Sequence, residues 1–225
     1  MVDALGAAEG VRSFMGEPAE ALVDVGRADA ALVTHLHPDH FDPATLRSAV
    51  NGGSIACPLE VADAVAECGL RPRGAEPWET IELAGFQCTA VPAVDGLGDP
   101  QVSWVVTDAD ARVIHCGDTL WHGHWWRIAE RVGPFDVAFL CINGARVRFP
   151  NLTPSGIEAD LTPEQAAAAA AVLGAGLAVP IHYGLFDAPP VYEETPRAES
   201  RFLAAASAGG LRTRVMAAGD TLELP

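Results

Sequence analysis

Histidine and aspartate gather in one short segment of the chain, where residues 34–40 read THLHPDH. Imidazole nitrogen and carboxylate oxygen are ligands that suit Zn(II), Fe(II) and Mn(II). His35 and His37 stand two positions apart, so on an extended backbone their side chains project to the same side. Asp39 and His40 follow a proline that turns the chain, and they can therefore face a second point close by. This spacing predicts ligands for two adjacent metal ions.

The flanking residues predict a strand before this segment and a helix after it. Residues 30–34 (AALVT) form a short apolar run that favours a strand, and Asp42-Pro43 is typical of an N-cap and the first residue of a helix. Such an arrangement places polar side chains on a loop held by rigid elements. The alternative is a histidine-rich surface loop that binds no ion.

Short β-like runs alternate with helical runs along the rest of the chain. We expect strands at 54–57, 78–83, 86–91, 102–107, 112–116, 137–142, 177–181, 213–216 and 221–224, and helices at 59–68, 125–132, 162–173 and 197–208. The pattern predicts one α/β (α+β) domain over residues 1–225, in which two mixed β-sheets pack together with helices outside, an αββα sandwich. Residues 143–160 are rich in proline and glycine, and a loop of this length predicts a lid over a site.

Composition excludes several classes of function. The formal net charge is −16, from 14 Lys+Arg against 30 Asp+Glu, so the chain offers no basic face for nucleic acid. We see neither an apolar run long enough to cross a bilayer nor a secretory signal at the N-terminus. Five cysteines stand singly without a C-x-x-C pair, which is typical of reduced thiols, and we therefore expect a cytoplasmic protein.

Three further segments end expected strands with residues of the ligand type. Residues 117–119 read GDT, residues 180–184 read PIHYG and residues 91–96 read VPAVDG. A carboxylate at position 118 could bridge two metal ions about 3.5–4 Å apart. With HLHPDH, these segments resemble the signature of the metallo-β-lactamase-fold hydrolase superfamily and occur in its order. GDTLWH, CINGA, LTPEQA and PIHYGLF resemble most the branch that contains L-ascorbate-6-phosphate lactonase.

The resemblance implies a role for each candidate ligand and two divalent ions as cofactors. Zinc is the first expectation for both ions, with Mn(II) or Fe(II) as alternatives. Metal 1 would be bound by His35, His37 and the residue at position 95, and metal 2 by Asp39, His40 and His182, with Asp118 between the two. A metal-bound hydroxide would then attack an ester, lactone or phosphoester of a small molecule, and Asp39 would act as the catalytic residue that orients the water or moves its proton.

Position 95 departs from the family, which normally has a histidine where this chain has Asp95. A third carboxylate makes the two-metal cluster less positive, which favours harder ions such as Mn(II) or Fe(II). It could also leave metal 1 weakly bound or absent. The alternative is that Asp95 only forms a turn with Gly96, in which case Asp99, His122 or His124 could substitute as ligands.

The N-terminus departs as well, since relatives have strands before a segment like residues 2–5 (VDAL). A sheet that lacks its first strands would expose an edge and part of an apolar face. Either the chain is truncated or another chain covers the gap, and for the second case we expect a homodimer or other homo-oligomer.

We expect a small-molecule substrate that can carry an anionic group, with neither nucleic acid nor a membrane as a partner. The expected substrate contacts are Trp121, His122, His124, Arg146 and Tyr183. Two alternatives remain open. One is a phosphodiesterase or nuclease on the same fold. The other is a non-catalytic metal- or ligand-binding protein whose site has degenerated.

Overall fold

The computed structural model describes residues 26–50 and 52–224. Its strands are β1 (Ala30–Leu32), β2 (Ser54–Pro58), β3 (Pro72–Ala75), β4 (Thr80–Leu83), β5 (Phe86–Pro92), β6 (Val102–Thr107), β7 (Arg112–His115), β8 (Phe135–Cys141), β9 (Arg146–Val147), β10 (Ala175–Ile181) and β11 (Tyr192–Glu193). Its helices are α2 (Pro43–Ala49), the 3₁₀ turn η1 (Leu59–Val61), α3 (Ala62–Glu67), α4 (Trp125–Val132), α5 (Pro163–Leu173) and α6 (Ala198–Ala208).

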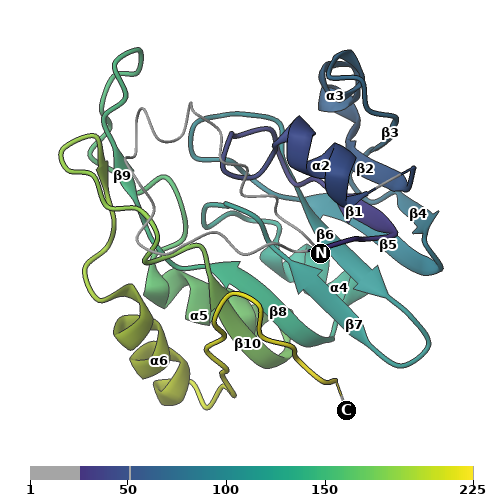
Figure 1. Ribbon diagram of the computed structural model, residues 1–225. Coiled ribbons are helices and arrows are strands. Elements are labelled where there is room, and N and C mark those ends of the chain that lie inside the picture. The colour runs from purple at the N-terminus through teal and green to yellow at the C-terminus, as the bar shows by residue number, and fades with distance from the viewer. Residues whose placement is uncertain (1–25, 51, 225) are drawn as a thin grey trace.

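Two sheets face each other and helices cover their outer sides (Figure 1). In the described residues the smaller sheet has the order β1-β2-β3 and is parallel throughout. The larger sheet is mixed, with the order β10-β8-β7-β6-β5-β4. Its β10, β8 and β7 are parallel, while β6, β5 and β4 alternate in direction. This confirms the predicted αββα class, although only the larger sheet is mixed.

Side-chain alternation along the strands divides the apolar residues among three layers of core. In β2, Ile55 points to the cluster under α2 and α3, while Ala56 points to the cluster between the two sheets. In β6, Trp104 faces the space between the sheets and Val105 faces the cluster under α4, α5 and α6. Strands buried on both faces lack the polar alternation of a surface strand, which is why their sequence is a continuous apolar run.

Most of the predicted elements are confirmed, and the helix starts agree best. Asp42 accepts hydrogen bonds from the first backbone N–H groups of α2, and Thr162 forms a capping box with Gln165 at the start of α5. The described residues contain no helix that is both long and apolar enough to span a membrane. The expected loss of strands before residues 2–5 lies outside the described residues.

The two terminal strands predicted at 213–216 and 221–224 are wrong. Only one parallel bridge forms, between Thr213 and Ala178 of β10. The next rung would need a backbone N–H from Pro180, which has none, so the ladder cannot extend along β10. Residues 221–224 pair with no strand in the described part of the chain.

The arrangement of the strands brings the candidate ligands to one edge of the molecule. β5, β7, β8 and β10 run in the same direction, so their carboxyl ends meet at that edge. The loop after β1 reaches the same edge from the smaller sheet, since Val102 N at the start of β6 donates a hydrogen bond to Thr34 O at 3.1 Å. Each ligand segment is therefore a loop anchored by a buried strand.

Trp104 joins the two sheets, because its fully buried indole Nε1 donates a hydrogen bond to Val33 O at 2.9 Å. We expect Trp104→Phe to lower the free energy of unfolding by about 1–3 kcal/mol, since the carbonyl of Val33 loses its buried donor. Urea denaturation measures this. Trp126→Phe is the matched control, because Trp126 is 56% exposed, and should change stability by less than about 0.5 kcal/mol. Equal effects in the two variants would contradict a joining role.

Candidate metal centre

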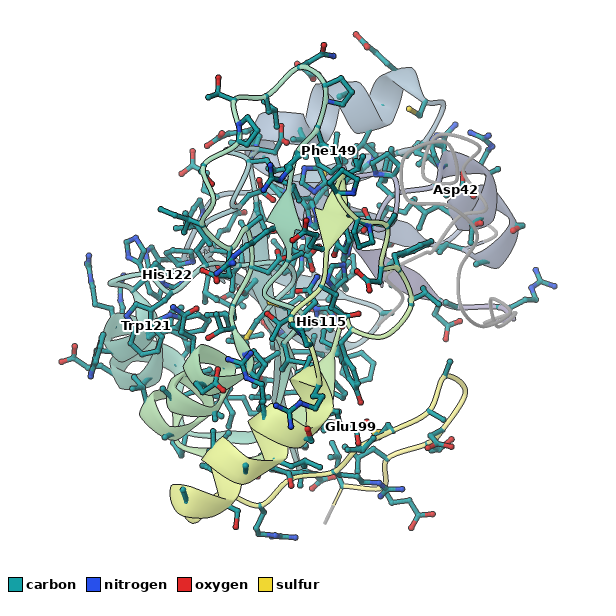
Figure 2. The ribbon with its side chains drawn as sticks, turned by 90° about the vertical axis from the view of Figure 1, so that its left-hand side faces the viewer. Asp42, His115, Trp121, His122, Phe149 and Glu199 are labelled. Atoms are coloured by element: carbon teal, nitrogen blue, oxygen red, sulfur yellow. The ribbon has the colours of Figure 1, made fainter. Side chains whose placement is uncertain are left out.

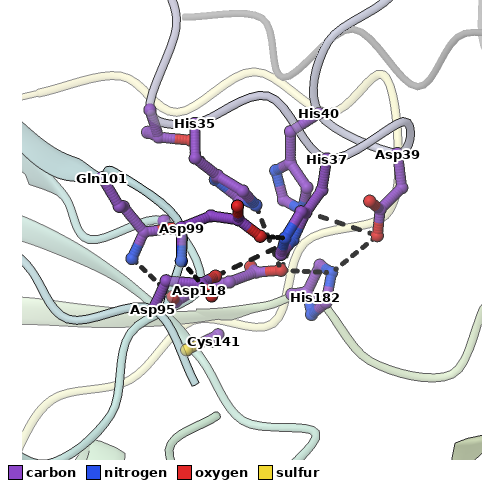
Figure 3. Close-up of polar contacts among 12 residues, drawn as sticks. His35, His37, Asp39, His40, Asp95, Asp99, Gln101, Asp118, Cys141 and His182 are labelled. Carbon is purple, nitrogen blue, oxygen red and sulfur yellow. Dashed lines mark hydrogen bonds and ion pairs between the residues drawn. The ribbon is translucent and has the colours of Figure 1, made fainter. Parts of the chain in front are cut away.

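Asp39, His40, Asp118 and His182 form one ligand group at the edge where the loops converge (Figure 3). Asp118 Oδ2 lies 2.9 Å from His40 Nε2 and 3.0 Å from His182 Nε2. Asp39 Oδ2 lies 3.5 Å from His182 Nε2 and 3.6 Å from His40 Nε2. One ligand atom of each residue lies within 4.8 Å of every other, so a single ion can contact all four.

His35, His37 and Asp95 form a second ligand group beside the first. His37 Nδ1 lies 3.7 Å from Asp95 Oδ2, and the rings of His35 and His37 meet edge to face at 4.5 Å between centroids. His35 Nε2 lies 4.0 Å from Asp118 Oδ2. Asp118 therefore reaches both groups, and the structure brings together all seven residues proposed as ligands from the sequence.

The unpaired polar atoms of this cluster fit a divalent cation. Among the described residues, His35 Nε2 and Asp118 Oδ1 are buried without a hydrogen-bond partner. The other ring nitrogen of His35 is 3.0 Å from the hydroxyl oxygen of Thr34. Burial lowers the pKa of His35 to about 3, helped by the neighbouring His40, so this imidazole stays in the neutral form that binds metals. Buried polar atoms are rarely left unpaired, and a cation would satisfy these two.

The carboxylates are held in their ionised form. Burial raises the pKa of Asp39, but the imidazoles of His40 and His182 outweigh it and hold the pKa of this carboxyl well below its usual range. The same balance lowers the pKa of Asp118, where His182 and His40 again overcome burial. An anionic carboxylate is the ligand form, and two of them suit a divalent ion.

Backbone conformation at two loops aims the ligands. Gly117 has φ of +62°, and a Cβ there would press against the side chain of Thr34 at 3.1 Å. His182 also lies in the left-handed region, with φ of +55°, which is uncommon for a residue with a Cβ. Strain of this kind is retained at functional sites when the surrounding structure holds it. At His182 it follows the end of β10 directly and aligns the imidazole with Asp118.

Asp95 forms a turn and still offers a ligand atom. Its Oδ1 accepts hydrogen bonds from Leu97 N at 2.7 Å and Asp99 N at 3.2 Å. Its Oδ2 faces His37. Burial raises the pKa of Asp95, while His37 and the two backbone donors act against it. We expected Asp95 either to form a turn or to bind metal. The turn uses Oδ1 and a metal would use Oδ2, so the two roles are compatible.

Asp99 contacts the opposite side of the His37 ring. Its Oδ2 lies 2.8 Å from His37 Nε2, whereas Nδ1 of the same ring faces Asp95. Asp99 is therefore not placed to substitute for Asp95 as a ligand. A carboxylate on the outer nitrogen of a metal-binding histidine fixes its tautomer and orientation. Asp99 thus holds His37 with Nδ1 toward the cluster.

The ligand groups open into a cavity of about 330 Å³. It is lined by His37, Pro38, Asp39, Asp95, Leu97, Asp118, Val147, Phe149, Pro150, Asn151, Ala159, Asp160, His182 and Tyr192. Asp160 was not predicted as a site residue, because it lies outside every motif. Burial raises the pKa of Asp160 to about 7, and the charge of Asp118 adds to this. Asn143, which bonds the Asp160 carboxyl, donates through Nδ2 to the Tyr192 hydroxyl at 2.5 Å.

The residues expected to contact substrate lie outside this lining. His122 stacks on Trp125 with 4.3 Å between ring centroids, and it lies near Trp121, well apart from Phe149 of the cavity (Figure 2). His124 is the N-cap residue of α4. Arg146 pairs with Glu158 at 2.6 Å. The Tyr183 hydroxyl donates to Glu199 at 2.9 Å.

We expect Asp99→Ala to weaken the binding of one metal ion by about 10- to 100-fold, because His37 loses the partner that orients it. Competition with a chelator of known affinity measures the effect. Asp99→Asn keeps an oxygen that accepts from Nε2–H and should lose less. Asp63→Ala removes an exposed carboxylate on α3 and should change nothing. Equal affinity in Asp99→Ala and wild type would rule out the orienting role.

Metal binding should release protons from His182. Burial alone would lower the pKa of this histidine, but Asp118 and Asp39 raise it to about 9 before a metal binds. At pH 7.5 the imidazole is then protonated, whereas a ligand must be neutral. We expect about one proton released per protein, and affinity that falls as the pH drops below about 9. Calorimetry in buffers of different ionisation enthalpy counts the protons, and a binding heat that does not depend on the buffer would contradict this.

Comparison with known proteins agrees with the geometry of the site. Residues 2–183 match the family model described as "Beta-lactamase superfamily domain". The UPF0173 metal-dependent hydrolase of Rubrobacter xylanophilus is 31% identical over 180 residues, which cover 74% of this chain and 69% of that protein.

Solved structures share the fold at lower identity. Igni18, a metallo hydrolase from Ignicoccus hospitalis, has a TM-score of 0.68 at 24% identity and covers 87% of this chain and 79% of its own. CmlA, a diiron β-hydroxylase from Streptomyces venezuelae, has a TM-score of 0.67 at 14% identity and covers 87% of this chain and 44% of its own. The family model covers most of the chain, and the Rubrobacter relative is named a metal-dependent hydrolase. The chain therefore belongs to the metallo-β-lactamase-fold superfamily and is a metal-dependent hydrolase.

Proposed function

We propose that this hydrolase cleaves an ester-type bond of a small molecule, in a carboxylic ester, a lactone or a phosphoester, at a two-metal centre. One observation carries the proposal. Asp118 lies within reach of two ligand groups, and the cluster they form opens into a cavity of about 330 Å³. Two divalent ions bound in these neighbouring groups would activate a water molecule and polarise the oxygen of the bond under attack. The branch that the sequence resembles contains a lactonase, which supports a lactone as one candidate substrate.

The chain's own groups would position the water and the substrate. Asp39 lines the cavity and stays ionised, so its carboxylate can accept a hydrogen bond from the water and orient it. Water adds its oxygen to the acyl carbon, or to phosphorus in a phosphoester, the bond from that atom to the leaving oxygen breaks, and a proton from the water passes to the leaving oxygen. An ester gives an acid and an alcohol, a lactone gives one hydroxy acid, and no further reactant is needed.

We propose that the two ligand groups differ in metal preference. The group of Asp39, His40, Asp118 and His182 holds the more tightly bound ion, with zinc as the first candidate. The group of His35, His37 and Asp95 supplies two imidazoles and one carboxylate, a set typical of non-haem iron sites. CmlA is described as a diiron enzyme, which supports iron as an alternative on this fold.

We further propose a cytoplasmic location. All five cysteines are free, and four of them are buried, which suits a reducing compartment.

Asp118→Asn should abolish the function by removing the charge that both ligand groups share. We expect both metals to be lost from the purified protein and kcat/KM on a responsive ester to fall by more than about 100-fold. Asp110→Asn, in the exposed turn after β6, is the matched control and should retain both. Elemental analysis and a rate assay give the two readouts. Full activity in an Asp118→Asn protein without metal would refute the two-metal proposal.

Metal analysis of protein purified without added metal separates hydrolysis from a non-catalytic role. Two bound ions, activity lost on chelation, and recovery with Zn(II), Mn(II) or Fe(II) are expected. A protein that holds no ion and hydrolyses none of the carboxylic ester, lactone and phosphodiester substrates would favour a degenerate site. Selective cleavage of the phosphodiester would favour the phosphodiesterase alternative.

A further inference from the structure

The segment 143–160 forms one wall of the cavity, and backbone hydrogen bonds hold it at two places. Its strand β9 pairs antiparallel with β11, with Val147 opposite Tyr192. At its base, Ala159 N donates a hydrogen bond to Ala145 O at 2.7 Å. Val147, Phe149 and Pro150 of this segment line the cavity. The segment expected to be a lid therefore has its base held by backbone hydrogen bonds, and Figure 1 shows β9 apart from the two main sheets.

This wall is mostly apolar: Val147, Phe149, Pro150 and Ala159 line the cavity from it, and Asn151 and Asp160 are its polar residues. Leu97 and Pro38, from the ligand loops, join the apolar side chains of the wall. Ligand cavities in proteins are mostly apolar with a few polar groups that fix the orientation of the ligand. Here the polar lining residues are the metal ligands His37, Asp39, Asp95, Asp118 and His182, together with Asn151, Asp160 and Tyr192. A substrate whose scissile bond reaches the centre must then place another part against the wall.

Within the described residues, the lining contains neither lysine nor arginine. Arg146 is adjacent in sequence to the lining residue Val147, but its guanidinium bonds Glu158 through two nitrogens, at 3.2 and 2.6 Å. The carboxyl groups of Asp39, Asp95, Asp118 and Asp160 also line the cavity and offset most of the charge of two divalent ions. An anionic group on the substrate would find no cationic side chain there, and burying an unpaired charge is costly.

We infer that the substrate is an uncharged carboxylic ester or lactone whose apolar group packs against Val147, Phe149 and Leu97. The inference rests on the proposed hydrolytic function and narrows it, since phosphate monoesters and diesters are anionic. It also replaces the anionic substrate that the sequence led us to expect. At about 330 Å³ the cavity is near the lower end of small-molecule sites, so the apolar group is short.

A series of lactones of one ring size, with alkyl chains of increasing length, tests the inference on the metal-loaded protein. We expect kcat/KM to rise by about threefold per methylene until the cavity is full. A matched lactone with a carboxylate at the end of its chain should react at least about tenfold more slowly, because its charge is desolvated without a partner. Equal or faster reaction of the carboxylate lactone would overturn the inference.

Variants of the wall locate the effect. Phe149→Ala should lower kcat/KM for the longest lactone by about tenfold or more, and by clearly less for the unsubstituted lactone. Ile157→Ala is the matched control, since Ile157 belongs to the same segment but is 67% exposed and outside the lining. Phe149→Arg should reverse the preference toward the carboxylate lactone. Equal losses in Phe149→Ala for short and long lactones would contradict the packing.

Binding of non-hydrolysable lactams separates this inference from the proposed function. An alkyl lactam should bind the metal-loaded protein more tightly than its carboxylate analogue, and Phe149→Ala should remove the difference, even if no lactone is cleaved. Alkyl lactam binding without hydrolysis of any ester, lactone or phosphoester would refute the proposed reaction and keep the apolar cavity. Hydrolysis with no preference between neutral and anionic ligands would support the proposed reaction and refute the inferred apolar substrate.

Discussion

The buried charge of Asp118 is the constraint around which the site is built. Its carboxylate lies at the end of β7, in contact with His40 and His182, and one oxygen has no hydrogen-bond partner in the described residues. An ionised group in such a place is tolerated only when opposite charge surrounds it. In the protein without metal the protonated imidazole of His182 supplies part of that charge, and bound divalent ions would supply it in its place. The segments that carry the imidazoles must therefore converge on one point.

The ligand segments that meet at Asp118 are held by strands of two different sheets. The smaller sheet delivers His35 at the end of β1, and the larger sheet delivers Asp118 and His182 at the ends of β7 and β10. Trp104 bonds across the interface to the strand that leads into the first ligand loop. Because the ligands come from both sheets, the geometry of the metal centre depends on how the sheets pack. Catalysis and the stability of the central core are coupled through this contact.

The sequence predicted what local chemistry determines and missed what depends on distant contacts. The caps at Asp42 and Thr162 follow from the hydrogen bonds of a few neighbouring residues, and both are confirmed. The strand at 213–216 failed because its pairing depended on Pro180, more than thirty residues away. The seven ligand residues were predicted from sequence motifs, and the structure brings them together. Asp160 and Phe149 belong to no motif. They line the cavity because the segment 143–160 runs across it, and local sequence does not determine that path.

The pairing of β9 with β11 has an evolutionary consequence. The wall of the cavity is fastened to the chain after His182 by backbone hydrogen bonds, which do not depend on the identity of the side chains. Residues such as Val147 and Phe149 can then change, or the loop between Phe149 and Ala159 can lengthen or shorten, without moving a ligand. Selection could diversify the substrates of this scaffold by altering one short hairpin-like insert, while the reactive centre is inherited intact.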